Sequence, residues 1–136
     1  MKGYGDDARL EALGDRYILL TLSRNSGEKQ DKVVFQCSVH SDWFDARVSG
    51  DISLKRIETY LSELREFLAL STDRVVFLNE YGNIRIECKR GRRGNVAVSG
   101  ILIKSMGEDD RMEYELETDL ASLDRFHKQL LHQLRQ

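Results

Sequence analysis

The sequence predicts an α+β fold: a largely antiparallel, twisted sheet of about seven strands, with two amphipathic helices packed on one face. Three observations predict it. Polar and apolar residues alternate through several short segments, such as Ile84 to Lys89, which is typical of strands with one buried face. Two longer segments instead repeat leucine at helical spacing. Loop residues separate the segments, and because the chain has no proline its turns depend on Gly, Asn, Asp and Ser.

The first half of the chain contains three predicted strands and one helix. Residues 1–15 are polar and punctuated by glycine, so we expect a flexible arm ahead of a single domain over residues 16–136. The strands are predicted at 17–23, 32–40 and 43–49. Gly50-Asp51 is expected to end the third strand. Ser53 is a suitable N-cap for a helix whose apolar stripe extends from Leu54 to Leu68.

The second half contains four predicted strands and a second helix. The strands are expected at 75–78, 83–89, 95–104 and 111–117. In the third of these the apolar phase shifts between Val98 and Ile101, which predicts a bulge at Gly100. Asp119 can cap the final helix, whose apolar side includes Leu120, Leu123, Leu130 and Leu134. No internal repeat is visible in the sequence.

Composition and charge narrow the classes of function. The chain has 136 residues and a formal net charge of −2, which gives no overall attraction to nucleic acid or acidic lipid. It has neither an apolar run near the roughly 18 residues of a membrane span nor a signal-peptide core after Met1. We therefore expect a cytoplasmic protein without a membrane partner. Nucleic acid is not favoured as a partner, and homo-oligomer formation stays open.

The sequence contains no known catalytic or metal-binding motif. Its histidines are His40, His127 and His132, and neither His127 nor His132 has a cysteine or carboxylate at ligand spacing. Cys37 and Cys88 share the apolar phases of separate strands, as buried thiols do, although a disulfide between neighbouring strands is an alternative. A catalytic dyad of His40 with Asp42 or Asp45 is also an alternative. We expect a non-enzymatic protein with no catalytic residues, metal ion or cofactor.

Acidic residues form the first candidate partner-binding site. Three of them, Glu108, Asp109 and Asp110, directly precede the last predicted strand. Within that strand, alternation places Glu113, Glu115 and Glu117 on one solvent-exposed face. Arg85 and Lys89, outward on their own strand, can neutralise this face. The alternative is that the face attracts a cationic protein.

A basic loop and two aromatic residues complete the candidates. The loop holds Arg90, Arg92 and Arg93, which can bind phosphates, bind an acidic protein surface, or keep a sheet edge soluble. Trp43 and Tyr81 are candidate apolar anchors of an interface. The competing interpretation of Trp43, the one tryptophan, is that it packs over the sheet edge as part of the core.

The order of several segments resembles a known family. The segment Trp43-Phe44-Asp45-Ala46-Arg47-Val48 precedes a helix rich in Leu and Glu at 54–70. The later segments are Asn83–Cys88, Gly94–Gly100 and Tyr114–Leu123. Over residues 17–134 this order is similar to WapI-like bacterial immunity proteins and related uncharacterised domains. The resemblance implies an α+β protein that neutralises a toxin domain by binding it, and it brings no catalytic residues. It does not cover the arm or the basic loop.

The predicted function is therefore a non-enzymatic protein-binding module of the immunity type, which occludes a cognate toxin. The acidic residues would attract the toxin if it were a basic nuclease. The alternative is a structural adaptor that associates with itself through its exposed edges. A small-molecule or nucleic-acid binder would instead require a deep pocket or a continuous basic groove.

Overall fold

The computed structural model describes residues 7–24, 32–42, 44–104 and 111–135, which form eight strands and two helices. Their order is β1 (Ala8–Ala12), β2 (Arg16–Arg24), β3 (Lys32–Ser41), β4 (Phe44–Ser53), α1 (Leu54–Leu68), β5 (Arg74–Leu78), β6 (Ile84–Arg90), β7 (Asn95–Ile103), β8 (Arg111–Asp119) and α2 (Leu120–Leu134). Seven of these strands and both helices lie where the sequence predicts them.

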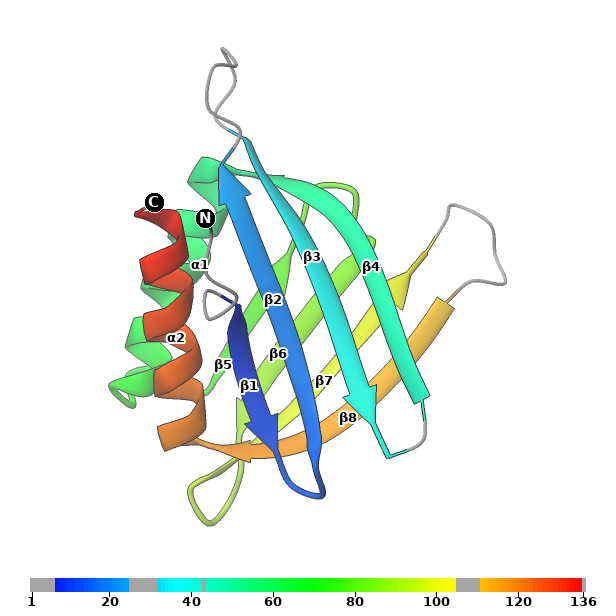
Figure 1. The fold of residues 1–136 in the computed structure, drawn as a ribbon. Coiled ribbons are helices and arrows are strands. Elements are labelled where there is room, and N and C mark those ends of the chain that lie inside the picture. The colour runs from blue at the N-terminus through cyan, green and yellow to red at the C-terminus, as the bar shows by residue number, and fades with distance from the viewer. Residues whose placement is uncertain (1–6, 25–31, 43, 105–110, 136) are drawn as a thin grey trace.

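The strands form two antiparallel sheets, β1-β2-β3-β4 and β5-β6-β7-β8. The α+β class and the antiparallel pairing are confirmed, but the expected single sheet of about seven strands is wrong. β4 leads directly into α1, so the chain turns into a helix before β5 can pair with β4. Figure 1 shows one sheet crossing in front of the other, with both helices along the same side of the molecule.

The structure differs most from the predicted strands at two places. Residues 8–12, which the sequence places in a flexible arm, form β1, and Ala8 and Leu10 are fully buried. This short strand has only two fully buried side chains, and α2, far along the chain, packs against it. β4 does not end at Gly50-Asp51 but pairs with β3 as far as Ser53. Ser53, the last residue of β4, is therefore also the N-cap of α1.

The two halves of the chain repeat one structural unit, a four-stranded meander followed by a 15-residue helix. Each helix begins directly after the last strand of its sheet. The predicted caps are confirmed: Ser53 Oγ accepts a hydrogen bond from the Arg56 N–H at 3.2 Å, and Asp119 Oδ1 accepts one from the Ser122 N–H at 2.7 Å. The repeat lies in element order and burial, not in residue identity, so the sequence does not reveal it.

One hydrophobic core joins both units. Phe77 on β5 packs edge-to-face against Phe35 on β3, with ring centroids 5.9 Å apart. It also packs edge-to-face against Tyr60 on α1, at 5.1 Å. Such aromatic pairs contribute about 0.5–1.5 kcal/mol beyond the burial of their area. Since Phe77 touches the other sheet and a helix, the two sheets and α1 share a single packed interior.

The predicted bulge at Gly100 is wrong. The pairing of β7 with β8 is unbroken from Asn95 to Ile103, and Gly100 faces the core. Tyr114 on β8 crosses Gly100 and donates a hydrogen bond from its hydroxyl to the backbone oxygen of Arg85 at 3.1 Å. A Cβ at Gly100 would collide with that oxygen and with the Tyr114 ring. Glycine is required here by a close approach of side chain and backbone.

Candidate protein-binding surfaces

The outer face of the second sheet carries the acidic stripe. Glu113, Glu115 and Glu117 alternate along β8 and are all exposed. Glu113 forms an ion pair with Arg111 at 3.3 Å, and the Asn95 side chain donates a hydrogen bond to Glu117 at 2.8 Å. Glu115 has neither kind of partner among the described residues. Its charge is therefore not neutralised within the part of the chain that the structure describes.

Arg85 and Lys89 do not neutralise the acidic stripe, because both contact Glu87. Arg85 Nη2 lies 2.7 Å from Glu87 Oε1 and Lys89 Nζ lies 3.8 Å from Oε2, while Arg74 Nε hydrogen-bonds the same Oε2. The Glu87 side chain is only 8% exposed. Burial acts to raise the pKa of Glu87, but the hydrogen bonds from Arg85 and Arg74 outweigh it and lower the pKa. The Glu87 carboxylate thus forms ion pairs with three cationic side chains, Arg74, Arg85 and Lys89.

Between these charges lies an uncharged strip. Ile101, Ser99 and Ala97 on β7 separate the glutamates of β8 from the cations of β6. A hollow of about 420 Å³ lies at this strip, lined by Arg85, Ser99, Gly100, Ile101, Glu113, Tyr114 and Glu115. The face is therefore polarised, with negative charge along one strand and positive charge two strands away.

The residues of the basic loop have different surroundings. Arg90 Nη2 donates hydrogen bonds to the backbone oxygens of Thr72, at 2.6 Å, and of Phe67 in the last turn of α1, at 3.4 Å. Its Nη1 pairs with Asp73 at 3.2 Å. Arg92 and Arg93 are exposed in the turn. Arg90 therefore stabilises the C-terminus of α1, which the sequence did not indicate.

The aromatic candidates and the acidic loop are placed only in part. Tyr81 lies in the turn between β5 and β6 and is 73% exposed. Trp43 and the acidic group Glu108, Asp109 and Asp110 lie outside the described residues. Of the predicted site, the structure brings together only the three glutamates on β8.

The histidines and cysteines form no metal-binding group within the described ranges. His40 stacks on Tyr17, with ring centroids 4.7 Å apart, and hydrogen-bonds Asp45 on the outer face of the first sheet. Cys37 and Cys88 are buried free thiols. Burial raises the pKa of each thiol to about 12, so both are protonated at neutral pH. They behave as small hydrophobic residues.

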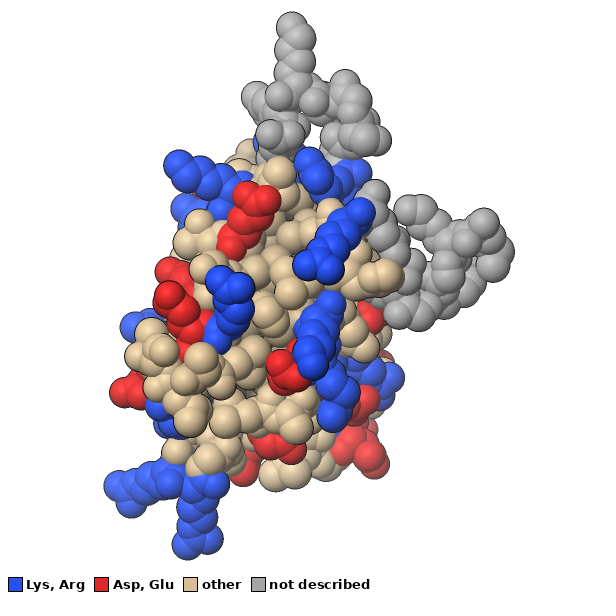
Figure 2. All heavy atoms as spheres, turned by 90° about the vertical axis from the view of Figure 1, so that its left-hand side faces the viewer, with Lys and Arg blue, Asp and Glu red and all other residues tan. Residues whose placement is uncertain are grey.

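The helix side carries mixed charge. Figure 2 shows Lys and Arg side chains interspersed there with Asp and Glu and with uncharged surface. A groove of about 350 Å³ between the helices is lined by Leu61, Leu131 and Leu134, with Arg65 and His127 beside them. Within the described chain, neither helix has the length and apolar character needed to cross a bilayer.

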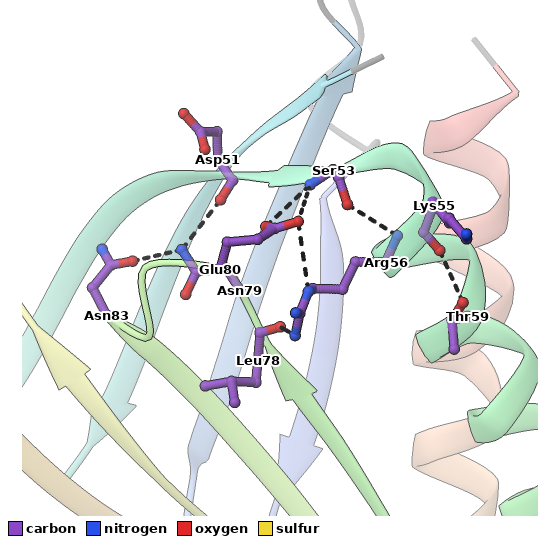
Figure 3. Close-up of polar contacts among 9 residues, drawn as sticks. All are labelled: Asp51, Ser53, Lys55, Arg56, Thr59, Leu78, Asn79, Glu80 and Asn83. Carbon is purple, nitrogen blue, oxygen red and sulfur yellow. Dashed lines mark hydrogen bonds and ion pairs between the residues drawn. The ribbon is translucent and has the colours of Figure 1, made fainter. Parts of the chain in front are cut away.

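A polar network joins the start of α1 to the end of β5 (Figure 3). The Glu80 carboxylate accepts hydrogen bonds from the Ser53 N–H at 3.3 Å and lies 3.5 Å from Arg56 Nε. Arg56 also donates to the backbone oxygen of Leu78 at 3.2 Å. Burial acts to raise the pKa of Glu80, but hydrogen bonding by Ser53 and the charge of Arg56 lower it overall. These contacts tie α1 to the end of β5.

Beside this network lies a cleft of about 550 Å³, which the sequence reasoning missed. Its lining comes from α1 and β5 and the residues next to them: Ser53, Lys55, Arg56, Thr59, Tyr60, Glu63, Val76, Leu78 and Glu80. One sequence signal could have indicated it. β5 is apolar on both phases, with Val75 and Phe77 facing the core and Val76 and Leu78 facing away. Apolar side chains on the outward phase of a strand often mark a covered or binding surface.

The fold and these surfaces define a class: an α+β protein of two crossed meanders with a charge-polarised sheet face and an open cleft. No family model and no curated protein matches the chain. A solved structure, titled as crystal structures of Trypanosoma bruciei MRP1/MRP2, is similar with a TM-score of 0.52 and 11% identity. The match covers 94% of this chain and 81% of that chain. At this identity the similarity shows a shared fold alone.

Proposed function

We propose that this protein is a non-enzymatic binding module that docks a cationic partner protein on the outer face of its second sheet. Glu115 supports the proposal most directly, since it is exposed among like charges and has no cation partner in the described chain. The cations nearest in register, Arg85 and Lys89, are engaged by Glu87. An acidic stripe that is only partly neutralised attracts a positive surface and accelerates its association.

The resemblance to WapI-like immunity proteins supplies a specific form of this proposal. The partner would be a basic toxin domain, and binding would occlude its working surface. Glu108, Asp109 and Asp110 directly precede β8 in sequence and add three negative charges ahead of the stripe. The proposal requires no catalytic residue, metal ion or cofactor of this chain.

The test begins with an affinity pull-down from the native host, with the captured protein identified by mass spectrometry. Its affinity is then measured by calorimetry for the wild type and for a Glu113→Lys, Glu115→Lys variant. We expect the variant to bind at least about tenfold more weakly. Glu66→Lys, an exposed change on α1, is the matched control and should leave affinity unchanged. Equal affinity of the wild type and the double variant would rule out the stripe as the docking surface.

A second candidate function is self-association as an adaptor. The arrangement of charges on the outer face of the second sheet favours it. In-register rows across the sheet are Glu113–Ile101–Arg85 and Glu117–Ala97–Lys89. A second copy rotated by a two-fold axis parallel to β7 would place its basic strand opposite the acidic strand of the first. The two outer rows of the face are therefore complementary in charge, whereas the middle row, Glu115–Ser99–Glu87, would bring two carboxylates together.

Light scattering over a concentration series separates the two candidates. An adaptor dimerises without a partner, and Glu117→Lys alone should weaken the dimer. Adding Lys89→Glu to that variant restores opposite charges across the interface and should restore the dimer. A monomer at all concentrations would exclude self-association.

A further inference from the structure

The cleft between α1 and β5 lies at the open edge of the second sheet. β5 is the first strand in the order β5-β6-β7-β8, so only one of its edges pairs with another strand. α1 contacts β5 on the other side, and the cleft of about 550 Å³ lies between them. This site is separate from the acidic stripe on β8 and goes beyond the function proposed above.

Hydrogen bonds show which backbone groups of β5 face the cleft. The Asp73 oxygen accepts a bond from the Arg90 N–H at 3.0 Å, so it points toward β6. The Leu78 oxygen accepts a bond from the Arg56 side chain, so it points toward α1. Because backbone groups alternate in direction along a strand, Val76 shares the direction of Leu78. No residue of the described chain hydrogen-bonds the N–H or C=O of Val76.

The first unit closes the equivalent edge. On β1, the outward residue Arg9 donates its backbone N–H to Gln129 Oε1 on α2 at 2.8 Å. Gln129 is the tenth residue of α2, and the tenth residue of α1 is Glu63. Glu63 lines the cleft beside Val76 but makes no hydrogen bond to it. The same architecture thus covers one edge strand and leaves the other open.

The geometry points to an extended segment of a partner protein as the occupant of this cleft, added to the edge of β5 as a further strand. The exposed backbone groups of Val76 would pair with the backbone of that segment. Leu78, 36% exposed, and Val76 offer an apolar surface for its side chains. A second copy of β5 fits less well, because it would bring its own α1 against the α1 that walls the cleft.

The charges of the cleft specify the chemistry of the segment. Arg56 and Glu80 neutralise each other, which leaves Lys55 and Glu63. These residues are eight positions apart on α1, about 12 Å along the helix axis. A strand covers that length in about four residues. The fitting segment therefore carries an acidic residue near Lys55 and a basic residue about four positions away near Glu63, with apolar residues between.

The test uses Val76→Pro, because proline removes the N–H that faces the cleft and leaves the bonds from β5 to β6 intact. A phage-displayed library of short random peptides is selected on the wild-type protein. The selected peptides, made synthetically, are then measured by fluorescence polarisation on both proteins. We expect extended peptides with acidic and basic residues about four apart, bound at least about tenfold more weakly by Val76→Pro. Bound peptide should also slow hydrogen exchange of the Val76 amide.

Two further variants make the outcome decisive. Glu63→Lys should favour peptides that carry an acidic residue in place of the basic residue expected near position 63. This variant replaces Val76→Pro in the test if Val76→Pro does not fold. Glu113→Lys, Glu115→Lys should bind the peptides unchanged, so loss of the acidic stripe and loss of the cleft are distinguishable. Three results would each overturn the inference. The library could yield no peptide, or both Val76→Pro and Glu63→Lys could bind the selected peptides as tightly as the wild type does. The third is a dimer of the wild type that Val76→Pro abolishes.

Discussion

His127 on α2 hydrogen-bonds the backbone oxygen of Leu61 on α1 through its Nε2, at 3.2 Å. A carbonyl oxygen only accepts, so Nε2 carries the proton. Each of the two residues is the eighth in its 15-residue helix. The contact therefore joins the two units through equivalent positions of their helices.

The burial of His127 predicts a pH-dependent stability. Burial lowers the pKa of His127 below its ordinary value of 6.5, more than its bond to Leu61 and nearby Asp124 raise it. The unfolded chain then binds the proton more readily, so stability is complete above about pH 6.5 and is lost as the pH falls from there through the folded value. His127→Gln should flatten this dependence in urea unfolding measured at several pH values. An identical slope in both proteins would contradict the prediction.

Arg90 should contribute more to stability than its neighbours in the basic loop. Arg90→Ala removes the hydrogen bonds to the backbone oxygens of Phe67 and Thr72 and the ion pair with Asp73. We expect a loss of about 1–3 kcal/mol in the free energy of unfolding. Arg92→Ala, in the exposed turn, should change it by less than about 0.5 kcal/mol. Urea titration followed by circular dichroism compares them, and equal losses would refute the capping role of Arg90.

Gly100 should tolerate no side chain. Gly100→Ala places a Cβ against the Arg85 oxygen and the Tyr114 ring, and we expect a destabilisation of about 1–3 kcal/mol. Tyr114→Phe keeps the ring and removes only the hydrogen bond, at a cost of about 0.5–1.5 kcal/mol. Ser99→Ala, on the outward phase of the same strand, is the control. Thermal unfolding measures the stability of all three variants. A Gly100→Ala variant as stable as the wild type would show that Tyr114 and the Arg85 oxygen do not approach Gly100 closely.

Glu87 should matter at neutral pH and lose its effect in acid. Glu87→Gln removes the charge that holds Arg74 and Arg85, and we expect a loss of about 1–3 kcal/mol at pH 7. Because the folded pKa of Glu87 is below its ordinary value of 4.5, its contribution is complete above that value and is lost as the pH falls through the folded pKa. The stabilities of wild type and variant should therefore converge in acid. A constant difference down to the acid transition would contradict this.

Local patterns predicted most of the elements. Seven strands were predicted because alternation is a property of neighbouring residues, and both helix caps because a cap bonds an amide three residues away in the same turn. β1 was missed because its burial depends on α2, which binds Arg9 through Gln129 far along the chain. The bulge at Gly100 was predicted wrongly because the core-facing phase continues from Val98 through Gly100 to Leu102, and Tyr114 from the next strand crosses the glycine.

In the candidate site, too, the sequence predicted local features but not contacts between distant segments. Sequence alone placed Glu113, Glu115 and Glu117 on one exposed face of a strand. Only the tertiary structure decided that Glu87 binds Arg85, that Arg90 caps a helix, and that the backbone of Val76 faces an open cleft. The physical reason is range: alternation and capping act within one turn or strand, whereas charge pairing, strand pairing and the covering of an edge depend on which distant segments meet in space.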